Sequence, residues 1–232
     1  MKILVFTLPR SASTNYCTHL SITHDLFDVG EPHALYYGAT TGHNSVDAEA
    51  YLEQSNELYL GNQNACMKIH AGHISEYVPH RNKRWLLDIL DATDEIHFLL
   101  RKDIQAQIKS YFVANYVSHN IDPTDHTKFI QTAYDSSWQD ELEIPDTPDN
   151  RALWKDAEML VHTQLVGLSV LYRTLIDRDP IVVWTEDIVN KLPGNKYHRP
   201  VKFGWEPEYM FPNDGFYPAD IGQIFKANQE CF

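Results

Sequence analysis

Basic residues are scarce in this chain. The 232 residues include 19 lysines and arginines but 32 aspartates and glutamates, for a formal net charge of −13. Nucleic acids and anionic membranes are bound mainly through extended basic surfaces. The charge balance therefore argues against both kinds of partner, and any site for an anionic ligand has to be a local cationic pocket in an acidic protein.

Cysteines are also few, and long apolar runs are absent. Cys17, Cys66 and Cys231 are far apart and follow no metal-binding spacing, so free thiols in a reducing compartment are the simpler interpretation. No stretch approaches the roughly 18 apolar residues of a membrane span. The apolar run at the N-terminus does not have the form of a signal peptide. We therefore expect a soluble, cytoplasmic protein.

What the sequence does contain is an alternation of apolar, β-favouring runs with amphipathic helical stretches, which predicts an α/β fold with a doubly wound, mainly parallel sheet. Ligands of such sheets bind at the carboxyl ends of the strands. We expect one domain over 1–232, with a core over 2–190, a helical insertion near 123–176 and an irregular tail over 191–232. The expected strands cover 2–8, 25–33, 65–70, 95–100 and 180–185, and the expected helices 16–23, 46–57, 84–92, 103–117, 128–138, 148–177 and 219–228.

The first candidate site follows the first strand, where Pro9-Arg10-Ser11-Ala12-Ser13-Thr14-Asn15 leads into a helix. A strand, a tight loop and a helix N-terminus direct backbone N–H groups and the positive end of the helix dipole towards an anion. Arg10 adds a charge, and Ser11, Ser13 and Thr14 add hydroxyl donors. Taken alone, the loop is equally compatible with an ordinary junction in which a serine caps the helix.

The second candidate site joins a strand to the helix after it. Arg101 follows a predicted strand, and Ser110 comes nine residues later on the next helix. Folded together, the guanidinium and the hydroxyl could hold one phosphate group. The alternative is that Arg101 pairs with a nearby acid and that Ser110 is a solvated helix residue.

Together, the two segments resemble the nucleotide-binding signatures of sulfotransferases that use 3′-phosphoadenosine 5′-phosphosulfate (PAPS). The segment from Pro9 to Thr14 is similar to that family's Pro-Arg-Ser-Gly-Ser-Thr loop for the 5′-phosphosulfate, with Ala12 in the usual place of glycine. A positive φ at that position would be less favourable for alanine. The Arg101…Ser110 segment is similar to the 3′-phosphate signature, and its nine-residue spacing with the interior Gln107 resembles the bacterial trehalose 2-sulfotransferase branch.

A third segment, Val183-Trp184-Thr185-Glu186-Asp187-Ile188, is similar to the Tyr-Glu-Asp-Leu that follows the last core strand in many sulfotransferases. Thr185 replaces the tyrosine. The resemblance covers residues 2–190, whereas the tail has no counterpart and the late Arg-Lys-Gly loop of the animal cytosolic enzymes is absent. It implies a P-loop-like sulfotransferase fold and transfer of a sulfuryl group from PAPS to a hydroxyl of a small molecule or carbohydrate.

The resemblance also implies roles for individual residues. Arg10, Ser11, Ala12, Ser13, Thr14 and Asn15 would bind the 5′ end of PAPS, and Arg101 and Ser110 its 3′-phosphate. Arg10 would neutralise the leaving phosphate, and Lys68 would join it on the bridging oxygen.

Two residues are candidates for the general base that accepts the proton of the acceptor hydroxyl. Gly30-Glu31-Pro32 resembles the Glu-Pro of carbohydrate and bacterial sulfotransferases, in which the glutamate is the proposed base. Lys68-Ile69-His70 resembles the Lys-Thr-His of cytosolic sulfotransferases, in which the histidine is the base. The nine-residue spacing after Arg101 favours Glu31, and the other residue would then orient the acceptor.

Other functions remain open from the sequence. His70 and His73 form the tightest pair among twelve histidines, but no carboxylate or cysteine lies at a matching spacing, so we expect no metal. The chain lacks the Gly-x-x-x-x-Gly-Lys-Ser/Thr of ATP and GTP P-loops, which counts against a nucleotide-dependent phosphotransferase. A non-catalytic nucleotide-binding protein that kept the fold is a further alternative. Neither the acceptor nor the oligomeric state can be read from the sequence.

Overall fold

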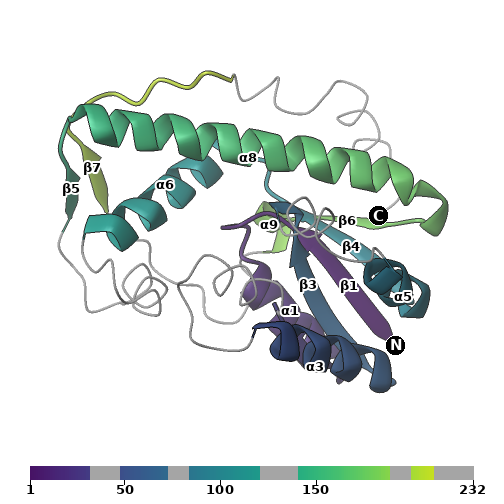
Figure 1. Ribbon diagram of the computed structural model, residues 1–232. Helices are drawn as coiled ribbons and strands as arrows, with labels where there is room; N and C mark the ends of the chain where they lie inside the picture. Colours follow the sequence, from purple (N-terminus) through teal and green to yellow (C-terminus); the bar gives the residue numbers. More distant parts are fainter. Residues whose placement is uncertain (32–47, 73–83, 121–140, 189–199, 212–232) are drawn as a thin grey trace.

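Five parallel strands form the central sheet of the protein, in the order β2-β3-β1-β4-β6 (Figure 1). The computed structural model describes residues 1–31, 48–72, 84–120, 141–188 and 200–211. The predicted α/β class with a mainly parallel sheet is confirmed. The strands are β1 (Lys2–Thr7), β2 (Phe27–Gly30), β3 (Ala65–His70), β4 (Glu95–Leu100) and β6 (Ile181–Trp184).

The register of the sheet brings three strand ends to one level. In the central strand, β1, Thr7 lies opposite His70 of β3 on one side and opposite Leu99 of β4 on the other. The segments that leave these strands therefore start side by side at the same edge of the sheet. At this edge lie the loop at Arg10, the β3 residue His70 and Arg101, which is the first residue after β4.

Helices cover both faces of the sheet, which is compatible with a doubly wound arrangement. On one face, Ile3 and Val5 pack with residues of α1 (Ser13–His24). On the other face, Leu4 and Phe6 belong to a larger core. That core includes residues from α3 (Ala48–Gly61), α5 (Arg84–Ala92), α6 (Ile104–Asn120) and α8 (Pro148–Thr174).

The longest helix, α8, begins where the sequence predicts it. The Thr147 hydroxyl accepts a hydrogen bond from the Asn150 N–H at 3.2 Å, and Pro148 occupies the first helical position, which is the favoured arrangement of cap and proline. The helix ends at Thr174, three residues before the predicted end, and a short 3₁₀ turn follows it. Its C-terminal part packs on the sheet, with Tyr172 edge-on to Phe98 at 5.2 Å between ring centroids.

A second, two-stranded sheet was not predicted. It pairs β5 (Leu142–Ile144) in parallel with β7 (Val201–Phe203). The tail expected to be irregular over 191–232 therefore contains a strand. Phe203 of β7 and Trp205 join Phe112 and Trp154 in an aromatic cluster, so this part of the tail is packed against α6 and α8. The helices predicted over 128–138 and 219–228 lie outside the described residues.

None of the described helices combines the length and the apolar character needed to cross a bilayer.

A buried histidine links α1 to the sheet. The hydroxyl of Tyr16 lies 2.7 Å from Nδ1 of His97, and Nε2 of His97 lies 3.1 Å from the Glu95 carboxylate. Burial lowers the pKa of His97, although the hydrogen bond to Glu95 opposes the shift. The folded protein therefore holds this imidazole in its neutral form over part of the pH range in which it would be charged in water.

This arrangement predicts a specific loss of stability in mild acid. Because His97 binds a proton more readily in the unfolded chain, the free energy of unfolding should fall as the pH drops below about 6.5. Urea denaturation between about pH 7 and about pH 5.5 should show a smaller decrease for His97→Asn, whose amide does not titrate but can still bond to Tyr16. The same decrease in both proteins would contradict the prediction.

Candidate functional site

The loop after β1 has an unusual backbone for its sequence. Arg10 and Ala12 both have positive φ, at 67° and 61°, in the left-handed region that favours glycine. The N–H of Tyr16 is the one that bonds to the Ala12 carbonyl at 3.0 Å, so the amides of Ser13, Thr14 and Asn15 occupy the first turn of α1 and point out of its end. The predicted anion-binding geometry of strand, loop and helix N-terminus is therefore present.

The hydroxyl groups of the loop face different ways. The Ser11 side chain is fully buried; its hydroxyl donates to the Leu8 carbonyl at 2.7 Å and also contacts the Thr7 hydroxyl. Ser13 is buried too, whereas Thr14 is exposed at the helix N-terminus. The Ser11 hydroxyl is thus used to hold the loop together.

Two neighbouring segments hold the loop in place. The Thr185 hydroxyl lies 2.8 Å from the Ser11 carbonyl and 3.0 Å from the Leu100 carbonyl, and so joins the loop to the end of β4. On α6, the buried amide of Gln107 donates to the Pro9 carbonyl at 2.8 Å. The loop carbonyls are therefore paired with protein groups that approach from outside the loop.

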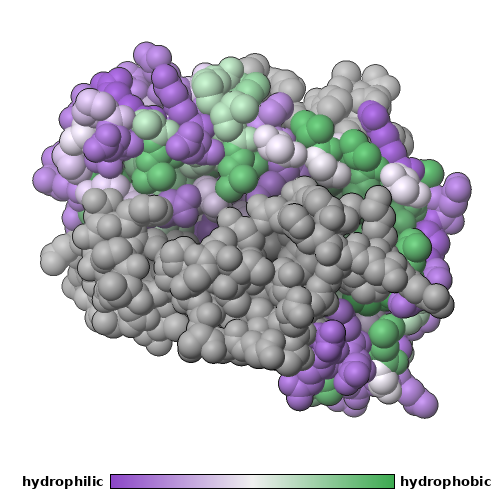
Figure 2. Space-filling model, viewed as in Figure 1, coloured by the Kyte–Doolittle hydropathy of each residue, from purple (hydrophilic) through white to green (hydrophobic). Residues whose placement is uncertain are grey.

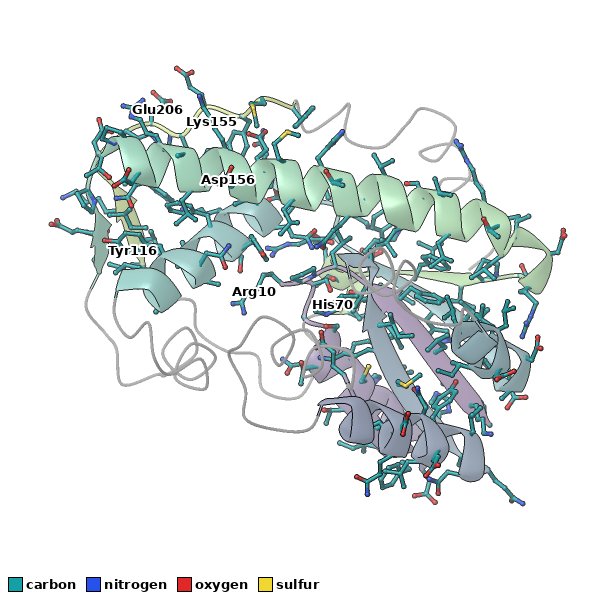
Figure 3. The ribbon with its side chains drawn as sticks, viewed as in Figure 1. Arg10, His70, Tyr116, Lys155, Asp156 and Glu206 are labelled. Carbon is teal, nitrogen blue, oxygen red and sulfur yellow. The ribbon has the colours of Figure 1, made fainter. Side chains whose placement is uncertain are left out.

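The two predicted phosphate-binding segments meet in the structure. Nε of Arg10 donates to the Ser110 hydroxyl at 3.2 Å, and the Arg101 guanidinium lies 3.5 Å from the Arg10 carbonyl. Arg10 extends from the loop towards α6 (Figure 3). Residues about one hundred positions apart in the sequence thus form one cationic cluster at the carboxyl edge of the sheet.

The segment that begins at Thr185 also fixes the turn after β4. It forms the short helix α9 (Thr185–Ile188). The Glu186 carboxylate accepts hydrogen bonds from the backbone N–H groups of Lys102 and Asp103 at 2.9 and 3.1 Å, and lies 3.7 Å from Nε of Arg101. Glu186 therefore holds in place the turn after β4 and also the side chain of Arg101, the second cation of the cluster.

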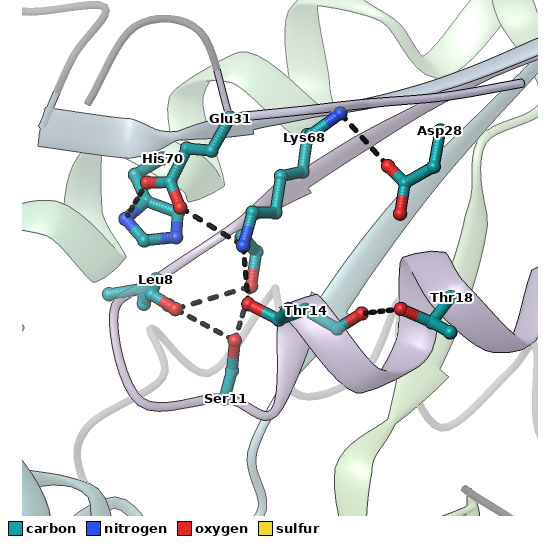
Figure 4. Close-up of polar contacts among 10 residues, drawn as sticks. Leu8, Ser11, Thr14, Thr18, Asp28, Glu31, Lys68 and His70 are labelled. Carbon is teal, nitrogen blue, oxygen red and sulfur yellow. Dashed lines mark hydrogen bonds and ion pairs between the residues drawn. The ribbon is translucent and has the colours of Figure 1, made fainter. Parts of the chain in front are cut away.

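The predicted rival bases are in direct contact with each other (Figure 4). Glu31 directly follows β2, and Oε1 of its carboxylate lies 3.0 Å from Nδ1 of His70. Oε2 lies 3.0 Å from Nζ of Lys68, which also donates to the Thr14 hydroxyl at 2.7 Å. Lys68 is only 5% exposed. The lysine thus connects the Glu31–His70 pair to the N-terminus of α1.

This pairing has a chemical consequence for His70. When Nδ1 carries the proton that it shares with the carboxylate, the lone pair of the neutral imidazole is on Nε2. A histidine oriented in this way by a carboxylate can act as a general base through its other nitrogen. The geometry therefore combines the two residues into one acid–base unit next to a buried cation.

One contact near the Glu31–His70 pair could not be predicted from the sequence. A Cβ atom added to Gly72, two residues after His70, would come within 2.7 Å of Nε2 of Gln164 on α8. The Gln164 side chain therefore lies directly against the segment that leaves β3. The sequence could not indicate this contact because it depends on how α8 crosses the end of the sheet.

No family model, curated protein or solved structure matches this chain. Within the described segments, no group of three histidine, cysteine, aspartate or glutamate side chains is placed to hold a metal ion. The chemistry of the site therefore has to be inferred from its own residues.

Because Ala12 has a left-handed backbone conformation, we expect Ala12→Gly to stabilise the protein. A left-handed conformation costs an L-residue roughly 1–2 kcal/mol, and glycine's greater freedom in the unfolded chain offsets part of the gain. We expect the free energy of unfolding to rise by up to about 1 kcal/mol in urea denaturation. The matched control, Ala152→Gly on an exposed turn of α8, should lower it by about 0.5–1 kcal/mol. If Ala12→Gly lowered the free energy of unfolding as much as Ala152→Gly does, the left-handed conformation of Ala12 would be refuted.

Proposed function

We propose that the protein transfers a sulfuryl group from PAPS to a hydroxyl of a small-molecule or carbohydrate acceptor. The observation that supports this most is the contact of Arg10 with Ser110. It brings the segment that resembles the 5′-phosphosulfate loop against the segment that resembles the 3′-phosphate signature. A donor that carries charge at both its 5′ and 3′ positions would use both parts of the cluster.

The proposed binding roles follow from position. The amides at the start of α1 and the Arg10 guanidinium would neutralise the 5′-phosphate, which gains charge as it leaves. Arg101 and Ser110 would bind the 3′-phosphate. Lys68, held beside Thr14, would reach the bridging oxygen between the phosphate and the sulfuryl group. Sulfuryl transfer, like phosphoryl transfer, depends mainly on such positioning and charge stabilisation.

The proposed reaction is a displacement at sulfur. The acceptor oxygen forms a bond to sulfur, the bond from sulfur to the phosphate oxygen breaks, and the acceptor proton passes to the enzyme. The products are a sulfate ester and adenosine 3′,5′-bisphosphate. We propose that Nε2 of His70 takes the proton and that Glu31 orients the imidazole, because both Glu31 oxygens already contact protein cations or donors. This reverses the division of roles favoured by the sequence.

Ligand-induced stabilisation tests the donor. A ligand that binds the folded state raises the unfolding temperature, and at equal concentration the tighter ligand raises it more. Adenosine 3′,5′-bisphosphate should therefore raise it more than AMP or ATP at equal concentration, since neither of these carries a 3′-phosphate. Arg101→Ala should abolish this preference, and Arg151→Ala, which removes an exposed arginine of α8, should retain it. Equal shifts with all three nucleotides in the natural protein would rule out the 3′-phosphate assignment.

Turnover of PAPS with a panel of hydroxylated acceptors tests the chemistry. Glu31→Gln and His70→Ala should each keep the bisphosphate-induced shift but lose activity by about 10²–10⁴-fold, as expected for removal of a general base or its orienting group. The double variant should lose no more than the worse single variant, because the two residues act as one unit. The exposed Glu53→Gln serves as control. Full activity in both single variants, or losses that multiply in the double variant, would contradict the proposed pair.

A further inference from the structure

The helix α8 has apolar side chains on its outward face as well as on its buried face. Met159, Val166 and Val170 are 47%, 44% and 57% exposed, and hydrophobic surface recurs along the ridge that α8 forms (Figure 2). Single exposed apolar residues are ordinary, but a row of them along one element marks an interaction surface. The row is notable in a chain whose net charge is −13.

The spacing of the outward residues is that of a helix-pairing seam. Six exposed residues follow one another at intervals of three and four along α8, and we call this set the outer seam: Asp156, Met159, Thr163, Val166, Val170 and Arg173. Alternating intervals of three and four keep side chains on a narrow stripe suited to packing against one other helix. Its central four positions are uncharged, and its ends carry opposite charges.

A glycine beside the outer seam supports the same interpretation. Gly167 lies in the interior of α8, where glycine is less favourable than alanine by about 1 kcal/mol. A Cβ atom there would meet nothing within 4 Å, so contacts with the described residues do not account for the missing side chain. A position without a side chain, next to Val166 and Val170, lets a second helix approach closely.

We propose that the outer seam is a dimer interface in which α8 packs antiparallel against α8 of a second copy of the chain. One register places Met159 opposite the partner's Val170 and Thr163 opposite the partner's Val166. The same register places Asp156 opposite the partner's Arg173. Two-fold symmetry repeats each contact, so four uncharged layers lie between two pairs of opposite charges.

Neighbouring registers are less favourable. A shift by one layer in one direction puts Asp156 against the partner's Val170, which would desolvate a carboxylate without a partner. A shift by one layer in the other direction puts Met159 against the partner's Arg173 and takes Asp156 past the end of the partner's seam. The charge pattern thus selects both the kind of partner, a second copy, and a single antiparallel alignment.

The interface would leave the candidate site accessible. The buried face of α8 is turned towards the sheet, and Gln164 on it lies against Gly72 near His70, whereas the outer seam is on the opposite side of the helix. This inference does not depend on the proposed function, and variants of the seam should bind adenosine 3′,5′-bisphosphate as the natural protein does.

Sedimentation velocity over a range of protein concentrations tests the proposal. The natural protein should be dimeric, and Val170→Glu should weaken the dimer by at least about tenfold, as for a central interface residue. Leu87→Glu is the matched control, because Leu87 is equally exposed, at 57%, but lies on α5. Gly167→Leu should also weaken the dimer while raising the helix propensity of α8, a combination that misfolding would not produce.

Charge reversal tests the alignment. Asp156→Arg and Arg173→Asp should each weaken the dimer, because each places like charges opposite one another at both ends of the seam. The double variant should restore the affinity, since it exchanges the charges within each pair. A natural protein that is monomeric at every concentration, a dimer that survives Val170→Glu, or a double variant weaker than both single variants would overturn the proposal. So would the finding that Leu87→Glu has the same effect as Val170→Glu.

Discussion

The candidate site depends on the pairing of β1 with its two neighbours. Thr7 lies opposite both His70 and Leu99, so the chain leaves three adjacent strands at one level and in one direction. This register alone brings together the Arg10 loop, the β3 residues and the Arg101 turn, which are widely separated in the sequence. The backbone hydrogen bonds of the sheet thus set the positions of these segments, and the helices pack around them.

At this edge of the sheet, acidic side chains lie next to basic ones. Although the protein is strongly acidic, the carboxylates of Glu31 and Glu186 each lie beside a cation at the site, Lys68 and Arg101. Such neighbours restrict the orientations of long, flexible cationic side chains and lower the cost of holding them at least partly away from water. The net charge of the chain, −13, opposes the approach of anions, so an anionic ligand would need several contacts at once with the local cations.

The sequence predicted the well-isolated elements to the residue. β3, β4 and α5 have the expected bounds, because each is a compact apolar or amphipathic run between turn-forming residues. The strands β5 and β7 were missed, since each has three residues and its partner lies 59 positions away. The predicted site residues lie together at one edge of the sheet, but the Glu31–His70 contact was not predicted. That contact depends on how β2 pairs with β3 across the irregularity between Asp28 and Gly30, which no sequence pattern encodes.

The left-handed residues of the loop have a consequence for how a ligand would be received. Arg10 and Ala12 are held in a conformation that they would rarely adopt alone, and the groups that hold them come from α6 and from the segment at Thr185. The amides at the start of α1 are therefore already oriented before any anion arrives. Association then requires little further ordering of the chain, so more of the interaction energy is available as affinity.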